Sequence, residues 1–513
     1  MARLHQILPG LYRDSVSLMQ LSAALEKLPG VERAAAVMAT PANLALLGES
    51  GLLSGKFAAG PNDLLVAVRG SSGAALAAAF ETARAALEQP SAATARGGPA
   101  AMPLRSLQMA LERTPGANLA LVSVPGDYAA AEAMKALRLG LNVMLFSDNV
   151  PLADEVALKR HASAHALLVM GPDCGTAIID GIPLGFANAV RRGAIGIVGA
   201  SGTGMQQVSC LVHREGAGVS QAIGTGGRDL HREVGGITML AGLNLLARDS
   251  ATQAIVLVSK PPAPEVAKAV LAAARRARKP VVVNFIGASQ AEIAGANLHP
   301  ARTLEDAALA AVALARARRP PRPAAYRAPP LRLGRMAAKQ RYLRGLYSGG
   351  TFCYEASALL GEALGEVSSN APVDPRRRMA DPWKSTGHSL VDLGDDVFTR
   401  GRPHPMIDHR LRNERLLEEA NDPSVALILM DVVLGYGAHR DPAAEMLPAI
   451  RKAQAIARRK GRSLAIVGFV CGTDGDPQGL ARQEAALREA GVLLATSSTR
   501  AARLAAHIIR RLP

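Results

Sequence analysis

Residues 194–214 read AIGIVGASGTGMQQVSCLVHR, and this stretch decides the fold class. An apolar, β-rich run leads into the turn Ser201-Gly202-Thr203-Gly204, and an amphipathic helical pattern follows the turn. A glycine-bearing turn between a strand and a helix presents free backbone N–H groups at the helix N-terminus, where an anion binds. The stretch therefore predicts a strand–turn–helix unit with an anion site at Ser201, Gly202, Thr203 and Gly204.

The same pattern recurs a short distance along the chain. Residues 218–224 (GVSQAIG) predict a short strand, and the turn Thr225-Gly226-Gly227-Arg228-Asp229 precedes the apolar run 237–246. Loops at the carboxyl ends of neighbouring parallel strands line one crevice. We therefore expect both turns to face the same phosphate, carboxylate or carbamoyl group. Arg228 either binds that anion through its guanidinium fork or forms a salt-bridged helix start capped by Asp229.

Length and composition indicate a large globular protein of several domains. The chain has 513 residues, which at about 150 residues per domain predicts three or four domains. A hydrophobic content of 49% with 20% charged residues is typical of buried parallel sheets. Aromatic residues make up only 3%, and Trp383 is the single tryptophan, which argues against a protein that stacks exposed bases.

The net charge of +16 is concentrated in one segment. Ten basic residues and no acidic residue lie between positions 316 and 344, interleaved with five prolines. Such a composition predicts a stiff, solvated linker. The excess elsewhere is +6, which is ordinary for an enzyme that handles small anions. We therefore expect no nucleic-acid partner.

The cysteines and the apolar runs indicate the cellular compartment. The four cysteines are far apart in the sequence and lack CxxC spacing, as expected of small buried residues in a reducing cytosol. No cluster with metal-ligand spacing occurs, and no metal site is predicted. No stretch reaches the roughly 18 apolar residues of a membrane span, and the start of the chain lacks a signal-peptide pattern. These patterns predict a cytoplasmic protein without a membrane partner.

Periodicity along the chain predicts an α/β protein built of tandem doubly wound parallel sheets. Near-continuous apolar strands alternate with helical segments from residue 119 to 285, and the same alternation resumes at 343. Strands near 34–39 and 63–68 indicate a small α/β N-terminal module, and the Ala-, Gly- and Pro-rich stretch 88–103 marks its end. The predicted domains are 1–100, the N-terminal module; 101–190, a Rossmann domain; 191–318 and 341–513, two further doubly wound domains; and 319–340, the basic linker.

Several turns at strand ends are also expected at one edge of the carboxyl-terminal sheet. One such turn precedes a predicted helix and contains Gly349, Gly350 and Thr351. These three residues are candidates for binding phosphate or substrate. Asp431 ends an apolar strand, and His439 lies in the glycine-rich turn after it. An acid beside a histidine can transfer a proton to a departing amide. Alternatively, Asp431 only binds backbone amides of the turn at 435–437.

A polar, irregular segment around residue 405 adds further candidate anion ligands. Its glycine and prolines make it unlike a solvated helix face, and at least one of its arginines is a candidate for binding the substrate anion, with Arg402 and Arg410 foremost. The polar residues of the segment are Arg400, Arg402, His404, Asp408, Arg410 and Arg412.

Five long motifs are specific enough to identify a family. They are GPDCGTAIIDGIPLGF (171–186), GIVGASGTG (196–204), QAIGTGGRD (221–229), LGDDVFTRGRPHPMIDHRLRNERL (393–416) and MDVVLGYGAH (430–439). These motifs resemble the FdrA family, and the resemblance covers most of the chain. Residues 117–288 more distantly resemble the α subunit of succinyl-CoA synthetase, with its CoA-binding and ligase domains. The resemblance implies a CoA-binding-like Rossmann domain at 101–190 and flavodoxin-like ligase domains at 191–318 and 341–513.

Two departures from the synthetases bear on the chemistry. Their phosphorylated histidine lies in a segment that here reads GASQAEIAGAN (287–297), without histidine; His299 is the nearest substitute. Their glutamate that steadies the histidine is replaced by Lys260, which makes the pocket more attractive to anions. No ATP-grasp domain is evident, so a self-contained ATP-driven ligase is not expected.

The family resemblance implies a carbamoyltransferase subunit. FdrA-like chains act with two partner subunits to interconvert oxalurate plus phosphate with oxamate plus carbamoyl phosphate, late in allantoin breakdown. Phosphate and carbamoyl phosphate would then be substrates, and no cofactor is implied. Positioning phosphate against a carbamoyl carbon needs no phosphoenzyme. The alternatives are a subunit of an NDP-forming acyl-CoA synthetase, which binds CoA or nucleotide, and a noncatalytic scaffold of such a complex.

Overall fold

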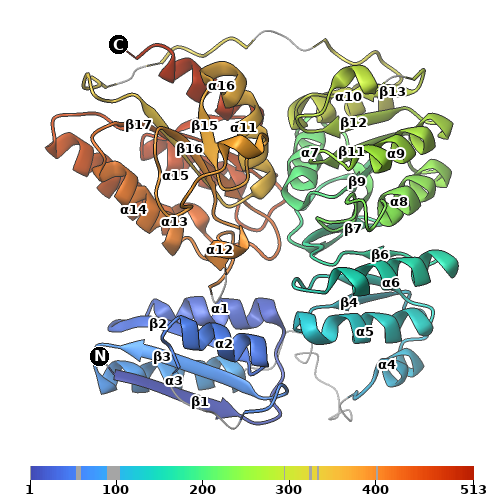
Figure 1. Ribbon diagram of the computed structural model, residues 1–513, viewed down its shortest axis with the longest axis horizontal. Helices are drawn as coiled ribbons and strands as arrows, with labels where there is room; N and C mark the ends of the chain where they lie inside the picture. Colours follow the sequence, from blue (N-terminus) through green and yellow to red (C-terminus); the bar gives the residue numbers. More distant parts are fainter. Residues whose placement is uncertain are drawn as a thin grey trace. The chain divides into compact units, whose positions relative to one another are not determined.

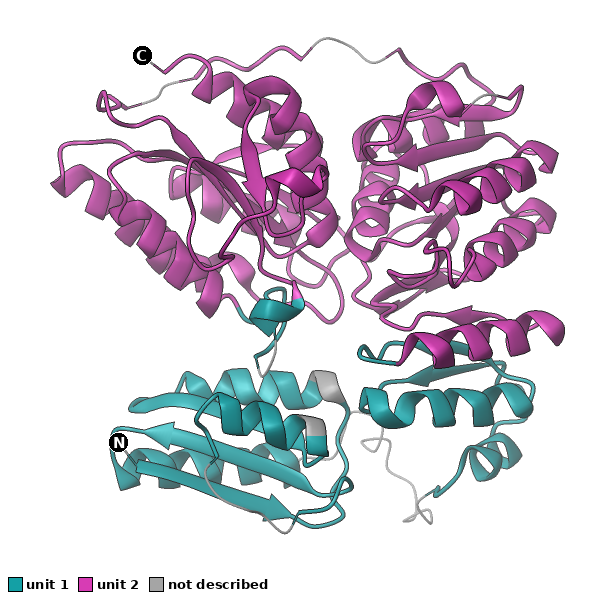
Figure 2. Cartoon of the chain, in the orientation of Figure 1, with its two compact units in different colours: residues 1–150, 396–408 teal, residues 151–395, 409–513 magenta. Residues whose placement is uncertain are grey.

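The computed structural model describes residues 2–53, 59–88, 104–293, 295–322, 326–331, 334–399 and 402–512. The chain divides into two compact units (Figure 2). The first contains residues 1–150 and 396–408, and the second contains residues 151–395 and 409–513. Helices alternate with strands in both, which confirms the α/β class (Figure 1). No described helix combines the length and the apolar character that a membrane span needs.

The first unit begins with an antiparallel sheet of strand order β1-β3-β2. Leu64, Val66 and Val68 of the central strand pack into one apolar cluster, while Leu65 and Ala67 pack into another. Burial on both faces explains why this strand reads as an unbroken apolar run. The elements are β1 (Ala2–Leu8), α1 (Ser15–Glu26), β2 (Val31–Met38), α2 (Pro41–Glu49), β3 (Leu64–Gly70) and α3 (Gly73–Glu88).

The rest of the first unit contains a parallel pair of strands, β4 and β5. The predicted module boundary at 88–103 falls almost wholly outside the described residues. The elements are α4 (Leu107–Arg113), β4 (Leu119–Val122), α5 (Gly126–Arg138), β5 (Asn142–Leu145) and α12 (Asp396–Thr399).

The second unit contains a seven-stranded sheet of order β13-β12-β11-β9-β10-β7-β8. The strands from β13 to β10 are parallel, and β7 and β8 form an antiparallel hairpin at one edge. Helix α7 packs against α10 and α8 against α9, so helices cover both faces (Figure 1). The strands are β7 (Thr176–Ile179), β8 (Ile182–Gly185), β9 (Arg192–Gly199), β10 (Val219–Gly224), β11 (Ala254–Ser259), β12 (Val281–Phe285) and β13 (Leu298–Pro300). The other elements of this part are α6 (Leu152–Ala164), β6 (Val169–Met170), α7 (Gly202–Arg214), α8 (Ile237–Arg248), α9 (Pro264–Arg276) and α10 (Leu304–Ala315).

A second sheet in the same unit has six parallel strands in the order β15-β16-β14-β17-β18-β19. Helices α11 and α16 pack together, as do α13, α14 and α15, which gives this sheet the predicted doubly wound form. The strands are β14 (Tyr342–Tyr347), β15 (Val367–Ser369), β16 (His388–Asp392), β17 (Val425–Val433), β18 (Ala465–Cys471) and β19 (Leu493–Ala495). The helices are α11 (Gly350–Leu364), α13 (Arg410–Asn421), α14 (Pro442–Arg459), α15 (Leu480–Glu489) and α16 (Ser498–Ile509).

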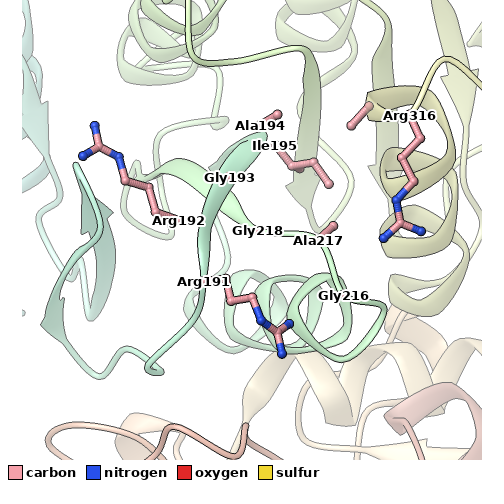
Figure 3. Close-up of a pocket in the computed structure, with 10 residues that line it drawn as sticks. Arg191, Arg192, Gly193, Ala194, Ile195, Gly216, Ala217, Gly218 and Arg316 are labelled. Atoms are coloured by element: carbon pink, nitrogen blue, oxygen red, sulfur yellow. The ribbon is translucent and has the colours of Figure 1, made fainter.

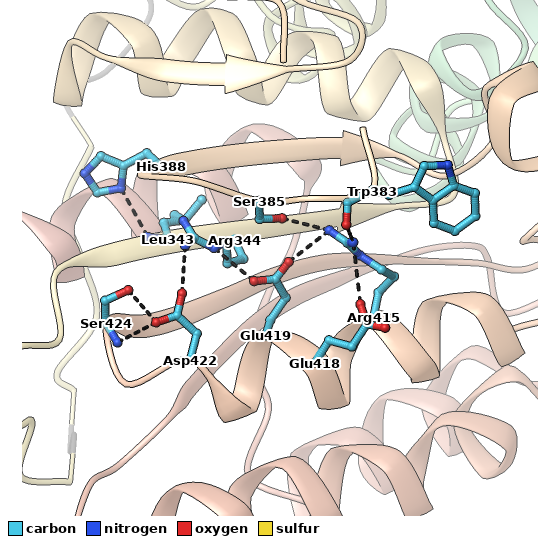
Figure 4. Close-up of polar contacts among 10 residues, drawn as sticks. All are labelled: Leu343, Arg344, Trp383, Ser385, His388, Arg415, Glu418, Glu419, Asp422 and Ser424. Atoms are coloured by element: carbon cyan, nitrogen blue, oxygen red, sulfur yellow. Dashed lines mark hydrogen bonds and ion pairs between the residues drawn. The ribbon is translucent and has the colours of Figure 1, made fainter. Parts of the chain in front are cut away.

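Arg344 corrects the prediction that the whole basic run 316–344 is solvated. Its side chain is buried in β14 and donates from Nε to Glu419 at 3.0 Å and from Nη2 to Asp422 at 3.1 Å (Figure 4). Glu419 also accepts from Arg415 at 3.1 Å. A buried guanidinium needs such partners. The last arginine of the run thus belongs to the sheet, whereas the described residues of 316–341 lie in no strand and no helix of two turns or more.

Buried polar contacts join the two sheets of the second unit. Glu355 on α11 accepts from the backbone N–H of Leu304 at 2.8 Å, at the start of α10, and from Ser498 Oγ at 2.6 Å, at the start of α16. Asn188, in the half that contains the seven-stranded sheet, donates to Asp476, in the half that contains the six-stranded sheet, at 2.8 Å. Burial raises the pKa of Glu355, while these donors oppose the rise. These contacts are consistent with the two halves belonging to one compact unit.

Candidate functional site

Two glycine turns, one from each sheet of the second unit, meet at their helix N-termini. Ser201 caps α7 and accepts from the N–H of Gly204 at 3.2 Å. Gly349 is the N-cap of α11, and Thr351 lies in its first turn. Ser201 Oγ and Thr351 Oγ1 lie 2.6 Å apart and share a hydrogen bond. The first turns of the two helices are therefore in direct contact, as Figure 1 also indicates from the neighbouring positions of α7 and α11.

Glycine is needed at two positions of these turns because neighbouring side chains fill the space around them. A Cβ added at Gly204 would overlap Ser201 Oγ and come within 3.2 Å of Thr351 Cγ2, and a Cβ added at Gly349 would come within 3.0 Å of Thr203 Cγ2. Gly202 is less crowded, since its added Cβ would meet only Thr176, with Oγ1 at 3.2 Å. The first N–H groups of each helix have no acceptor within the helix, and the helix dipole favours an anion there. Two such ends side by side are the candidate anion site.

The second predicted turn, Thr225-Gly226-Gly227-Arg228, lies beside the first, since the N–H of Thr225 donates to the carbonyl oxygen of Gly199 at 2.9 Å. The carbonyl oxygen of Thr225 accepts from Lys159 Nζ at 2.9 Å, and both groups are buried. A Cβ at Gly226 would overlap the carbonyl oxygen of Pro172, so protein backbone already covers this part of the turn. Gly227 is exposed, and that both turns face one anion stays a prediction.

Arg228 and Asp229 instead form a salt-bridged helix start, the alternative interpretation. Arg228 pairs with Glu155 at 2.9 Å. Asp229 is fully buried, pairs with Lys159 at 2.7 Å and accepts from the N–H groups of Thr238 and Met239 at the start of α8. These four charges hold α6, the second turn and α8 together.

Lys260 places a positive charge next to α11. It follows β11, and its Nζ lies 5.3 Å from the ring centroid of Tyr354 on α11, within cation–π range. Its ammonium also acts electrostatically on Asp392 and Cys353 of the opposite half. The exposed lysine therefore adds a positive charge beside the N-terminus of α11.

Asp392 is a site residue that the sequence reasoning misses. It ends β16, is 7% exposed, and its Oδ2 lies so close to Gly350 that an added Cβ there would overlap it. Burial raises its pKa to about 6, although Lys260 opposes the rise. The available sequence signal is its place immediately before the motif that starts at Leu393.

Asp431 is an anchor for the turn and cannot serve as the predicted proton donor. Its carboxylate is fully buried and accepts from Ser348 N at 2.9 Å, Ser348 Oγ at 2.9 Å and Gly349 N at 2.8 Å. Arg412 Nη1 pairs with it at 2.8 Å. The prediction that it binds the amides of the turn at 435–437 is also wrong, because the amides it binds belong to the preceding glycine turn on β14.

His439 is not paired with Asp431, so the predicted acid–histidine pair is absent. Its Nδ1 accepts from the N–H of Asp441 at 3.0 Å, and its Nε2 lies 4.0 Å from Glu445. Its ring centroid lies 5.4 Å from that of His409, whose Nδ1 is 3.0 Å from Arg412 Nη2. His439 therefore lies next to His409, and His409 in turn contacts Arg412.

The predicted arginines of the segment near 405 are distributed over different environments. Arg400 lies outside the described residues, and Arg402 belongs to the first compact unit. Arg410 begins α13 in the second unit, and Arg412 is buried against Asp431. His404, in the first unit, has its pKa lowered to about 4 by burial.

His299 is no substitute for a phosphohistidine at the turns. It lies in β13 and pairs in register with Val282, the second residue of β12. The anion turns follow the carboxyl ends of their strands, whereas His299 stands beside the amino end of β12. Burial lowers its pKa.

A cavity of about 270 Å³ lies at the opposite, amino-terminal edge of the seven-stranded sheet (Figure 3). Its lining includes Arg191, Arg192 and Arg316. Arg192 pairs with Asp180, while Arg191 and Arg316 donate to the carbonyl oxygens of His213 and Glu215. All three arginines thus have protein partners, and the cavity is separate from the paired turns.

Family models match three parts of the chain. A CoA-ligase model matches residues 346–508, and a CoA-binding domain model matches residues 190–303. The latter match covers the half that contains Ser201 and Lys260, whereas the predicted CoA-binding-like domain is 101–190. A model described as the heavy metal-associated domain of AllF matches residues 1–103.

The residues of the N-terminal module do not fit a thiolate metal site. Residues 1–103 contain no cysteine and one histidine, His5. Among the described residues, no group of three histidine, cysteine, aspartate or glutamate side chains has the arrangement of a metal site. The module therefore lacks the thiolate ligands that heavy-metal sites commonly use.

The chain is also similar to sequence relatives and, more weakly, to a solved structure. The chain is 46% identical over 513 residues to YahF of Escherichia coli strain K12, covering 98% of both chains. It is 28% identical over 149 residues to the α subunit of succinate–CoA ligase from Staphylococcus epidermidis, 28% of this chain and about half (48%) of that subunit. A dinucleotide-forming acetyl-CoA synthetase from Ca. Korarchaeum cryptofilum matches at 16% identity with a TM-score of 0.32, over 77% of this chain and 83% of that one. The chain belongs to the FdrA family, the family of YahF, and is distantly similar to the α subunit of succinyl-CoA synthetase.

Proposed function

We propose that this chain supplies the phosphate site of a ligase-type enzyme that moves an acyl group between a carrier and inorganic phosphate. The product is an acyl phosphate, a mixed anhydride. The observation that carries the proposal is the contact of two helix N-termini, joined by the 2.6 Å hydrogen bond between Ser201 and Thr351. A phosphate bound there accepts from both hydroxyls in place of the bond between them.

The charges at the turns suit a phosphate dianion. Each helix N-terminus carries about half a positive charge, and Lys260 adds one more. Asp431 and Arg412 hold the turn before Gly349 in a fixed position. Prepositioned donors of this kind also stabilise the negative charge that develops when phosphate attacks an acyl carbon.

The transfer proceeds by direct attack and needs no phosphoenzyme. Residues 287–297 contain no histidine, and His299 stands away from the turns. Lys260 lies at the position where the synthetases have a glutamate beside their histidine. Nucleotide chemistry, where it follows, belongs to a partner subunit.

A CoA thioester is the first candidate for the acyl carrier. Models for a CoA-binding domain and a CoA-ligase match the two halves that supply the paired turns, and a synthetase α subunit is a distant relative. This makes the chain a subunit of an NDP-forming acyl-CoA synthetase type of enzyme.

A ureido acid such as oxalurate is the second candidate. The missing histidine favours it, because carbamoyl phosphate can then leave as the product without passing its phosphoryl group to the protein. The enzyme would be a carbamoyltransferase with two partner subunits, releasing oxamate. The third candidate is a scaffold that carries out no chemistry. A functional phosphate site would exclude it.

The test uses the complex obtained by coexpressing the chain with the products of neighbouring genes. Phosphorus NMR follows inorganic phosphate with either succinyl-CoA or oxalurate, and an acyl phosphate signal with one of them is expected. A signal with oxalurate alone would identify the carbamoyltransferase. No acyl phosphate with either carrier, at phosphate concentrations that saturate the complex, would overturn the proposal.

Calorimetric titration of the chain with phosphate tests the site itself. Lys260→Met is expected to weaken binding about tenfold, equivalent to about 1.4 kcal/mol. Lys268→Met is the matched control, since Lys268 is an exposed lysine on α9 of the same half. Equal affinities of the two variants would remove Lys260 from the site.

A further inference from the structure

Asp392 is a buried carboxylate, and only one of its two oxygens accepts a hydrogen bond from the described residues. Its Oδ1 accepts from the N–H of Gly394 at 3.0 Å. Among the described residues, its Oδ2 has no hydrogen-bond partner, and this oxygen lies against Gly350, the first residue of α11. Asp431, in contrast, uses both of its oxygens to hold the turn. We propose that Asp392 is the catalytic residue that carries a proton between phosphate and the leaving atom. This inference rests on the phosphate site proposed for the paired turns.

The backbone around Asp392 keeps this carboxylate in place. Its N–H donates to Asn370 Oδ1 at 2.9 Å, and its carbonyl oxygen accepts from Asn370 Nδ2 at 3.0 Å. Asn370 is itself buried. This carboxylate therefore stands beside the first turn of α11, against Gly350, the residue before Thr351.

The charged and titratable groups around Asp392 allow both of its protonation forms. Lys260 faces it from the opposite half, Cys353 from α11, Asp431 from β17 and Asp395 from its own loop. Burial raises the pKa to about 6, Lys260 lowers it, and Asp395 and Asp431 raise it. Bound phosphate adds a further negative charge and favours the acid form. Near neutral pH the group can therefore both give and take a proton.

The proton balance of the reaction requires one such group. A phosphate oxygen forms a bond to the acyl carbon while the bond from that carbon to the leaving atom breaks. The leaving atom is the sulfur of a thioester or the amide nitrogen of a ureido acid, and it takes the proton of Asp392. The resulting carboxylate then takes the proton that the phosphate hydroxyl loses. No oxidant, reductant or further reactant enters.

The experiment compares Asp392→Asn with wild type in the coexpressed complex. Phosphate affinity is measured by calorimetry, and acyl phosphate formation by phosphorus NMR across a pH series. The variant is expected to bind phosphate at least as tightly, because a negative charge is removed, while turnover falls about 10²- to 10⁴-fold. The wild-type rate is expected to fall as pH rises through the titration of Asp392. The pH–rate profile of the variant is expected to lack this fall. Glu366→Gln, an exposed carboxylate of the same half, is the control.

Each outcome separates the role of Asp392 from the phosphate site. Turnover of Asp392→Asn within threefold of wild type, or an unchanged pH profile, would overturn the inference while leaving the proposed function intact. Loss of phosphate affinity together with turnover would assign Asp392 a structural role and overturn it as well. A wild-type complex that binds phosphate but forms no acyl phosphate would overturn the proposed function, and the inference with it.

Discussion

Ser201 Oγ and Thr351 Oγ1 lie 2.6 Å apart although 150 residues separate them in the sequence. Each hydroxyl belongs to the first turn of a helix that follows a glycine turn, one on each sheet of the second unit. The contact therefore joins two half-sites into one. Neither half alone presents two helix N-termini to the same anion.

A double-mutant cycle of Ser201→Ala and Thr351→Val tests this contact. Ser201→Ala is expected to cost about 1 kcal/mol of unfolding free energy, because it also removes the cap of α7. The coupling energy between the two positions is expected at about 0.5–1.5 kcal/mol. Urea unfolding of the four proteins gives both values. Strict additivity would mean that the two hydroxyls do not share a hydrogen bond in solution.

Two glycines of α11 should respond differently to alanine. Gly350→Ala places a Cβ onto Asp392 Oδ2, so the carboxylate must move. We expect acyl phosphate formation by the coexpressed complex, followed by phosphorus NMR, to fall at least tenfold, with the fold retained. Gly361→Ala is the control, since an added Cβ there meets nothing within 4 Å, and it should stabilise the helix by about 0.5–1 kcal/mol. Equal turnover by both variants would contradict this account of the turn.

Most of the fold could be predicted because central parallel strands are buried on both faces. The apolar runs 254–258 and 281–285 are the strands β11 and β12. The exposed edge strand β1 and the hairpin strand β8 were missed, because strands with one or both faces open to water need no continuous apolar run. The strand β16 was missed as well, since polar residues stand at both its ends.

The site could be predicted only where it depends on local sequence. The turns at Ser201 and Gly349 follow from glycine and cap chemistry within a few residues. Which turn meets which depends on how the two sheets pack, and no local pattern encodes that. Asp431 illustrates the limit, because its partner Arg412 and its bound amides come from elements far away in the sequence.

The ion pair of Asp431 and Arg412 should be essential for stability. Asp431→Asn leaves the Arg412 guanidinium buried without its counter-charge and weakens the hold on the amides of Ser348 and Gly349. The expected loss is about 3–5 kcal/mol of unfolding free energy, measured with urea. Glu418→Gln removes a carboxylate that is 66% exposed and lies 3.5 Å from Arg415, and should cost less than about 1 kcal/mol. Similar losses in both variants would show that Asp431 is not an anchor.

Asp392 should make the protein less stable as pH rises. Its pKa of about 6 in the folded chain lies above the ordinary value of 3.8, so the folded state binds the proton more tightly than the unfolded state. The resulting stability is fully present below about pH 4 and is lost as pH rises through about 6, and its size is about 3 kcal/mol. Asp392→Asn cannot ionise. The free energy of unfolding of this variant, relative to wild type, should therefore increase between pH 4 and pH 7 and then remain constant. Urea unfolding at a series of pH values measures the difference, and parallel curves for the two proteins across that range would show that Asp392 titrates normally and is not held in a buried site.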